Sequence, residues 1–207
     1  NSTKNDRFSG YAGETRAKIQ TLSEISLQET PRFTSGFKEL DRVLGGGIVP
    51  GSAILIGGHP GAGKSTLLLQ VMCGLAKNMT ALYVTGEESL QQVAMRANRL
   101  NLPTNKLNML SETSVEQICN LADQLKPQII VVDSIQVMHL SDIQSSPGSV
   151  AQVRECASFL TRYAKTRQVA IIMVGHVTKD GTLAGPKVLE HAIDCSLLLE
   201  GEADSRF

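Results

Sequence analysis

Residues 58–65 read Gly-His-Pro-Gly-Ala-Gly-Lys-Ser, and this stretch fits the pattern G-x-x-x-x-G-K-[ST] of a phosphate-binding loop. A short apolar run, residues 52–56, precedes the loop, and a helical pattern over residues 64–77 follows it. Glycines allow main-chain N–H groups to point at a phosphate, and the N-terminus of the following helix adds positive potential. The order of strand, glycine-rich loop and helix therefore predicts a site for the phosphates of a nucleotide.

Two side chains of this loop have predicted roles of their own. The ammonium of Lys64 is expected to neutralise the β- and γ-phosphate oxygens, and the hydroxyl of Ser65 is expected to bind Mg²⁺. ATP or ADP with Mg²⁺ is therefore the expected cofactor. The residues expected to contact the nucleotide are Gly58, His59, Pro60, Gly61, Ala62, Gly63, Lys64, Ser65 and Thr66.

A carboxylate follows a continuous apolar run further along the chain. Residues 129–133 read Ile-Ile-Val-Val-Asp, which is typical of a strand buried on both faces. Beside a phosphate loop, Asp133 is predicted to hold Mg²⁺ directly or through water, and the hydroxyl of Ser134 is a candidate to assist. The alternative is that Asp133 only caps its strand.

Hydrolysis of ATP also needs a group that positions or deprotonates water. Residues 85–89, Thr-Gly-Glu-Glu-Ser, follow the second predicted strand, and the C-terminal ends of parallel strands face the ligand. Glu87 is favoured as the general base and Glu88 is second; the alternative is that both are solvated or that one caps the next helix. His176 ends another strand and is expected to contact the γ-phosphate, unless it only bonds a neighbouring loop.

Apolar runs and helical patterns alternate along the rest of the chain. This alternation predicts a three-layer α/β domain, with a mostly parallel, twisted sheet flanked by helices, over residues 31–207. Residues 1–30 are polar and small and read as a linker or arm. The expected strands are residues 52–56, 80–85, 107–110, 129–132, 169–174 and 193–199, and the expected helices are residues 64–77, 89–100, 115–125 and 150–165.

Composition excludes several classes of protein. The 207 residues carry 20 basic and 20 acidic side chains, so the chain does not coat DNA or an anionic membrane by bulk charge. Aromatic residues make up 4%, which argues against base-stacking platforms. The four cysteines are far apart and are expected to be free, buried thiols in a reducing compartment. Because no apolar run is long enough to span a bilayer and no secretion signal opens the chain, no membrane partner and a cytoplasmic location are expected.

These motifs together resemble the RecA-like ATPase superfamily, with a P-loop NTPase fold, and most narrowly the bacterial RadA family of recombination and repair ATPases. Some of the motifs are shared with relatives such as KaiC, whereas Ser-Ser-Pro-Gly and Gly-His-Val-Thr-Lys-Asp-Gly are closer to RadA. The resemblance covers most of the chain after residue 22. It rests on residues 33–41, 44–47, 50–51, 58–65, 83–89, 132–136, 145–148, 175–181 and 185–187.

The resemblance implies a DNA-dependent ATPase of recombinational repair that promotes branch migration. In such proteins ATP binds between subunits of a homo-oligomeric ring, usually a hexamer, and hydrolysis drives movement on single-stranded DNA; branched DNA and a recombinase of the RecA type are implied partners. Two DNA loops map onto residues 138–149 and 177–187, where Lys179 and Lys187 are the candidate DNA contacts or simply solvated lysines. Gln92 and Arg96 are expected either to line the adenine pocket or to lie on an exposed helix face.

Three parts of that family's pattern are absent from this sequence: the four-cysteine zinc finger, a Lys-Asn-Arg-Phe-Gly motif and a Lon-protease-like domain. No zinc is therefore expected here. Because the missing Lys and Arg resemble a trans-acting finger, we expect this chain to bind nucleotide but to hydrolyse it slowly. The alternative function is a KaiC-like regulatory module whose nucleotide state controls partner binding without DNA transport. A metabolite kinase is disfavoured because no acceptor-binding lid is evident.

Overall fold

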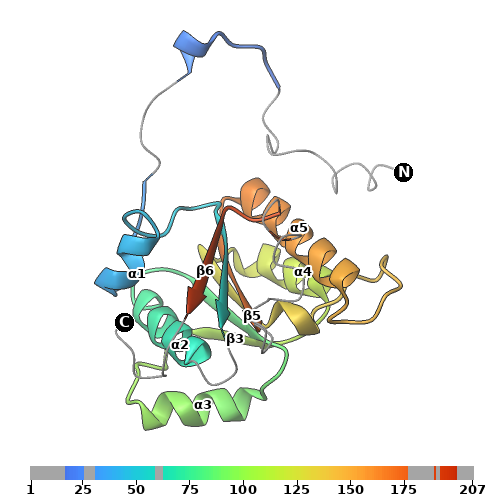
Figure 1. The fold of residues 1–207 in the computed structure, drawn as a ribbon. Coiled ribbons are helices and arrows are strands. Elements are labelled where there is room, and N and C mark those ends of the chain that lie inside the picture. Colours follow the sequence, from blue (N-terminus) through green and yellow to red (C-terminus); the bar gives the residue numbers. More distant parts are fainter. Residues whose placement is uncertain (1–16, 26–30, 59–62, 177–188, 190–191, 200–207) are drawn as a thin grey trace.

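A computed structural model describes residues 17–25, 31–58, 63–176, 189 and 192–199. Six parallel strands form one sheet in the order β3-β2-β4-β5-β1-β6. Helices lie on both sides of this sheet (Figure 1). Each strand that we expected is present, with ends shifted by no more than two residues. The strands are β1 (Ala53–Gly58), β2 (Ala81–Thr85), β3 (Asn108–Ser111), β4 (Ile129–Asp133), β5 (Ala170–His176) and β6 (Cys195–Leu199).

Three of the helices begin directly after a serine whose side chain caps them. Ser89, Ser114 and Ser149 each accept a hydrogen bond from the main-chain N–H three residues later, which satisfies a helix N-terminus. Helix α1 was not predicted, because six residues are too few to show a helical period. The helices are α1 (Lys38–Val43), α2 (Lys64–Leu75), α3 (Leu90–Arg99), α4 (Val115–Leu125) and α5 (Val150–Arg167), with 3₁₀ turns η2 (Leu22–Glu24) and η3 (Ile135–Val137).

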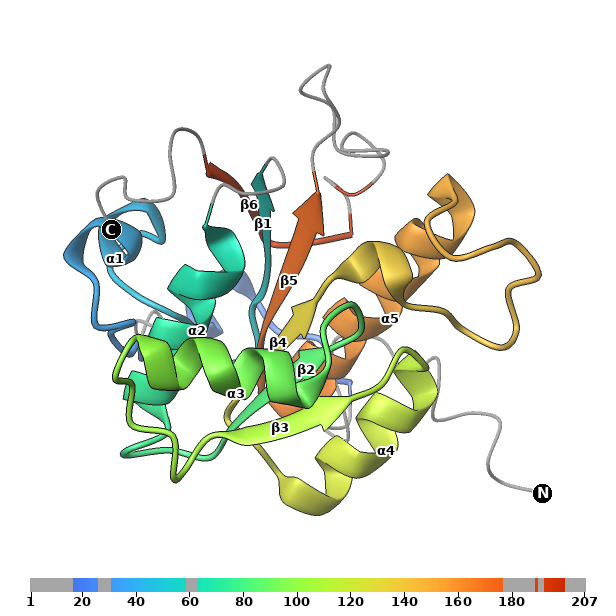
Figure 2. The ribbon, with the colours of Figure 1, turned by 90° about the horizontal axis from the view of Figure 1, so that it is seen from below.

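Two separate apolar cores lie on the two faces of the sheet. Alternate residues of one strand point to opposite faces, so Ile54 packs with α2 while Leu55 packs with α4 and α5. Helices α1, α2 and α3 cover one face and helices α4 and α5 cover the other, as Figure 2 shows. The three-layer arrangement expected from the sequence is therefore confirmed.

The C-terminal edge of the sheet collects the polar residues that end its strands. Thr85 pairs with Asp133 across β2 and β4, and Gly58 pairs with His176 across β1 and β5. Because all six strands run in the same direction, these four residues come to one edge. Parallel α/β sheets bind their ligands at this edge.

The cysteines are free, as predicted. Cys73, Cys119 and Cys156 are buried in helices, and Cys195 is half-buried in β6. Burial raises the pKa of the Cys119 thiol and raises that of Cys156 to about 12, so these groups stay protonated. Within the part of the chain that the structure describes, no helix is both long and apolar enough to cross a bilayer.

Residues 138–149 form a loop that α5 holds through one buried amide. Gln152, which is 1% exposed, accepts a hydrogen bond from the main-chain N–H of Leu140 at 3.0 Å. Its Nε2 donates to the main-chain oxygen of Ser145 at 2.8 Å. The loop therefore has a defined shape even though it carries no regular structure.

Replacing this amide tests how far the loop depends on it. Gln152→Leu keeps the side-chain volume but leaves the buried N–H of Leu140 without an acceptor, so the free energy of unfolding should fall by about 2 kcal/mol. Urea unfolding monitored by circular dichroism measures the change. Gln117→Leu, at an exposed position of α4, is the control and should leave stability unchanged. Equal stability of the two variants would contradict the anchoring role.

Candidate nucleotide and magnesium site

Helix α2 begins directly after the predicted phosphate loop. Gly63 precedes it with φ 81°, a left-handed conformation that glycine adopts without strain. Lys64 is the first residue of α2 and is only 3% exposed. Burial lowers the pKa of the Lys64 ammonium, and the carboxylates of Asp133 and Glu87 oppose that shift. A cation is therefore buried at the helix N-terminus, at the edge where the strands end.

The middle of the loop lies outside the described residues. His59, Pro60, Gly61 and Ala62 therefore remain predicted nucleotide contacts only. Of the flanking residues, Gly58 ends β1, and Ser65 and Thr66 lie half-buried in the first turn of α2.

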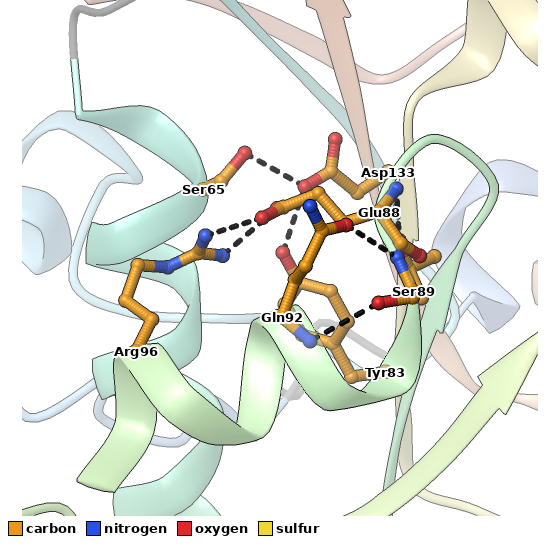
Figure 3. A network of polar contacts seen from close by, with 8 residues as sticks. Ser65, Tyr83, Glu88, Ser89, Gln92, Arg96 and Asp133 are labelled. Carbon is orange, nitrogen blue, oxygen red and sulfur yellow. Dashed lines mark hydrogen bonds and ion pairs between the residues drawn. The ribbon is translucent and has the colours of Figure 1, made fainter. Parts of the chain in front are cut away.

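Asp133 lies at the centre of a buried cluster of hydroxyl groups. Its carboxylate is 4% exposed and accepts hydrogen bonds at Oδ2 from Ser65 Oγ at 2.7 Å and from the Tyr83 hydroxyl at 2.8 Å (Figure 3). The bond to Ser65 joins two elements 68 residues apart in sequence, the end of β4 and the start of α2.

The donor chemistry of this pair fits magnesium. A hydroxyl and a carboxylate are hard oxygen ligands of the kind that Mg²⁺ prefers, and such sites need few protein ligands because the nucleotide and water supply the rest. Ser65 and Asp133 are the residues that would hold the ion. Elsewhere among residues whose positions are described, no three His, Cys, Asp or Glu side chains cluster as a metal site would require.

Glu87 is held by two neighbours from different strand ends. Ser134 Oγ donates to its Oε1 at 2.7 Å, and His176 Nε2 lies 3.0 Å from each carboxylate oxygen. The hydrogen bond with His176 lowers the pKa of Glu87, and Ser134 and Lys64 lower it further against the effect of burial. Glu87 is therefore a carboxylate at neutral pH, in the ionisation state that a general base requires.

The main chain of His176 is fixed by a second contact. Gln136, in η3, accepts from the His176 N–H and donates to the His176 carbonyl, both at 3.2 Å. The other ring nitrogen, Nδ1, is buried and meets no partner among the described residues. His176 thus bonds Glu87 in the segment after β2, which is the bond to a neighbouring loop that the sequence gave as the alternative. Its contact with the γ-phosphate stays a prediction.

Glu88 has a different environment from Glu87. Arg96 of α3 binds it through two parallel hydrogen bonds of 2.6 and 3.0 Å (Figure 3). This pairing raises the pKa of the Arg96 guanidinium. Arg96 is a permanent cation bound to both oxygens of Glu88, whereas the partners of Glu87 are a serine hydroxyl and a histidine ring, so Glu88 is less suited than Glu87 to accept a proton from water.

Arg96 and Gln92 correct part of the sequence interpretation. The side chain of Arg96 is 18% exposed, so it does not lie on an exposed helix face. Gln92 is exposed, and its side chain accepts a hydrogen bond from the N–H of Ser89 and so completes the N-terminal cap of α3. Nη1 and Nη2 of Arg96 bind Glu88, whereas its Nε is buried and has no partner among the described residues. The side-chain oxygen of Gln92 belongs to the cap, and a contact of either residue with adenine stays a prediction.

Sequence reasoning missed Tyr83 and Gln136. Tyr83 reads as one more apolar residue of a buried strand, and Gln136 as a polar residue after one. The one signal was the position of each beside a predicted site residue. Lys179 and Lys187, the candidate DNA contacts, lie outside the described residues.

Comparisons with known proteins agree with the fold and with the family resemblance. A family model described as an AAA domain matches residues 18–182. The chain is 94% identical over 205 residues to a DNA repair protein RadA of Haemophilus influenzae and 74% identical to that of Escherichia coli. Each match covers 99% of this chain and 45% of the relative. The RadA of Bacillus subtilis is 48% identical, over 95% of this chain and 43% of its own length.

The chain thus spans a little under half the length of these curated relatives. Among solved structures, a KaiC-like protein of Pyrococcus horikoshii matches with a TM-score of 0.68 at 17% identity, covering 86% of this chain and 85% of that one. This likeness confirms the RecA-like fold, and the sequence matches confirm the resemblance to RadA.

Lys64 provides a direct test of the phosphate site. Lys64→Ala removes the buried cation that faces the predicted phosphates, so binding of fluorescent ADP with Mg²⁺ should weaken by at least about tenfold, the loss of one strong charged contact. Fluorescence anisotropy measures the affinity. Lys77→Ala, at an exposed position after α2, is the matched control and should bind like the parent. Unchanged affinity of the Lys64 variant would remove the phosphate-site assignment.

Proposed function

This chain belongs to the family of AAA domains, and we propose that it is the ATP-hydrolysing core of a DNA repair protein that binds ATP with Mg²⁺ and single-stranded DNA. The observation that supports this proposal best is the Ser65–Asp133 hydrogen bond of 2.7 Å beside the buried Lys64. It brings Ser65 and Asp133, the proposed magnesium ligands, next to Lys64, the proposed phosphate-binding cation, at one edge of the sheet. The names of the most similar relatives supply the link to DNA repair.

The proposed mechanism gives each residue of the site one task. Lys64 and the N-terminus of α2 bind the phosphates, and Ser65 and Asp133 would hold Mg²⁺, which supplies charge neutralisation to the β- and γ-phosphates. Glu87 orients the attacking water and accepts its proton. The ring of His176 lies against Glu87, so a γ-phosphate arriving there would meet both side chains.

We propose that DNA contacts the two stretches of chain that follow β4 and β5. The first, residues 138–149, is held to α5 by Gln152, and the second contains Lys179 and Lys187. Because the chain has no net charge, these loops would bind phosphate groups by local contacts instead of by a broad basic surface. We further propose that the subunits form a ring, that the protein promotes branch migration and that a RecA-type recombinase is a partner.

A KaiC-like regulatory module without DNA transport is the second candidate. The zero formal net charge favours it, because proteins that bind DNA generally present an excess of basic residues. Both candidates need the nucleotide site, so only DNA dependence separates them.

Two neighbouring carboxylates allow the base to be identified. Glu87→Gln should keep magnesium nucleotide binding and lower ATP turnover by about 10²-fold or more, because an amide cannot accept the proton from water. Glu88→Gln is the matched control and should retain more turnover, because it loses only its pairing with Arg96. A coupled assay of phosphate release measures both. If instead the Glu88 variant were the less active one, Glu88 would be the base.

DNA dependence decides between the two candidate functions. Single-stranded DNA should raise the rate of phosphate release, and Lys179→Ala should weaken DNA binding equally for all sequences and reduce its salt dependence by about one ion. Filter binding at several salt concentrations measures this, with Lys77→Ala as the control. A chain that hydrolyses ATP but neither binds DNA nor responds to it would favour the regulatory module.

A further inference from the structure

Tyr83 places a hydroxyl group among the aliphatic residues in the middle of β2. It lies between Leu82 and Val84 in β2, and its side chain is fully buried at 0% exposure. Phenylalanine would fill the same space without bringing a polar group into the core. Since a buried hydroxyl is costly unless it finds a partner, the contact that it makes needs an explanation.

That contact is with the predicted magnesium carboxylate. The Tyr83 hydroxyl donates to Asp133 Oδ2 at 2.8 Å, inside the protein. In the sheet, Thr85 pairs with Asp133 and Tyr83 pairs with Val131. Because side chains alternate, Tyr83 and Asp133 share the face that α2 covers, and the long phenol reaches along the sheet to the end of β4.

Two hydroxyl groups from different elements therefore meet on one oxygen. Ser65 comes from α2 at the ligand side, and Tyr83 comes from beneath, out of β2 (Figure 3). Two donors at one oxygen fix the plane of the carboxylate, whereas one donor would allow it to rotate. When Ser65 turns its oxygen to an arriving ion, Tyr83 still holds Asp133 in place.

We propose that Tyr83 is a positioning residue for magnesium: its hydroxyl holds Asp133 Oδ2 and leaves Oδ1 to face the hydration shell of the ion. This inference rests on the proposed function, because it assumes a magnesium nucleotide at the site. Residues that orient a metal ligand from behind commonly change metal affinity about 10-fold to 100-fold when they are removed.

The chemistry of the phenol suits this role. Burial raises the pKa of Tyr83 well above its ordinary value, and the negative charge of Asp133 raises it further. A serine or water in the same place would not be held as firmly, because the ring of Tyr83 is enclosed by the core on all sides.

Magnesium dependence of nucleotide binding tests the inference. Fluorescent ADP is titrated onto the parent and Tyr83→Phe, first in EDTA and then at increasing Mg²⁺. Affinity in EDTA should be unchanged, and the Mg²⁺ concentration for half-maximal tightening should rise about tenfold. Tyr163→Phe is the matched control, because Tyr163 also donates to a carboxylate, Asp123, but on α5 far from the site. It should leave both quantities unchanged.

The possible results separate the two proposals. If the parent binds no ADP under any condition, the nucleotide site itself is wrong. If the parent responds to Mg²⁺ and Tyr83→Phe responds equally, only the role of Tyr83 is wrong, and the phenol is a packing residue. If Tyr83→Phe does not fold, a crystal structure of the parent with Mg²⁺ and ADP decides: a Tyr83 hydroxyl bonded to Asp133 supports the inference, and one turned away from it overturns it.

Discussion

A carboxylate that is almost fully buried at the end of a strand is the constraint on which this site depends. Removing the Asp133 side chain from water is unfavourable unless donors and a positive charge surround it. Ser65 and Tyr83 supply the donors, and Lys64 supplies the charge. Lys64 and Ser65 come from the first turn of α2 and Tyr83 comes from β2, so the carboxylate fixes how that turn sits against β2 and β4.

Apolar packing on both faces of the sheet stabilises this arrangement of Asp133 and its partners. The face toward α2 and α3 contains Tyr83 and the strand residues around it, and the face toward α4 and α5 carries the loop of residues 138–149 through Gln152. The proposed nucleotide site and the loop proposed for DNA are thus supported from opposite sides of the same sheet. The proposed nucleotide site and this loop are connected by the C-terminal ends of the strands, above all by β4 and the turn η3 that follows it.

The sequence predicted the strands, the longer helices and the order of the site along the chain, because apolar periodicity and the phosphate-loop pattern are local signals. It could not predict which side chains meet. Glu87 and Glu88 are adjacent in sequence, yet one bonds His176 and the other Arg96, and this separation depends on loop conformation. The contact of Tyr83 with Asp133 depends on strand register, which no single segment specifies.

The pair of hydrogen bonds between Gln136 and the main chain of His176 has a mechanical consequence. The side chain of Gln136 joins the turn η3, after β4, to the tip of β5, in addition to the main-chain pairing of the two strands. A displacement of the turn after β4 would therefore also displace the main chain of His176, whose imidazole contacts Glu87.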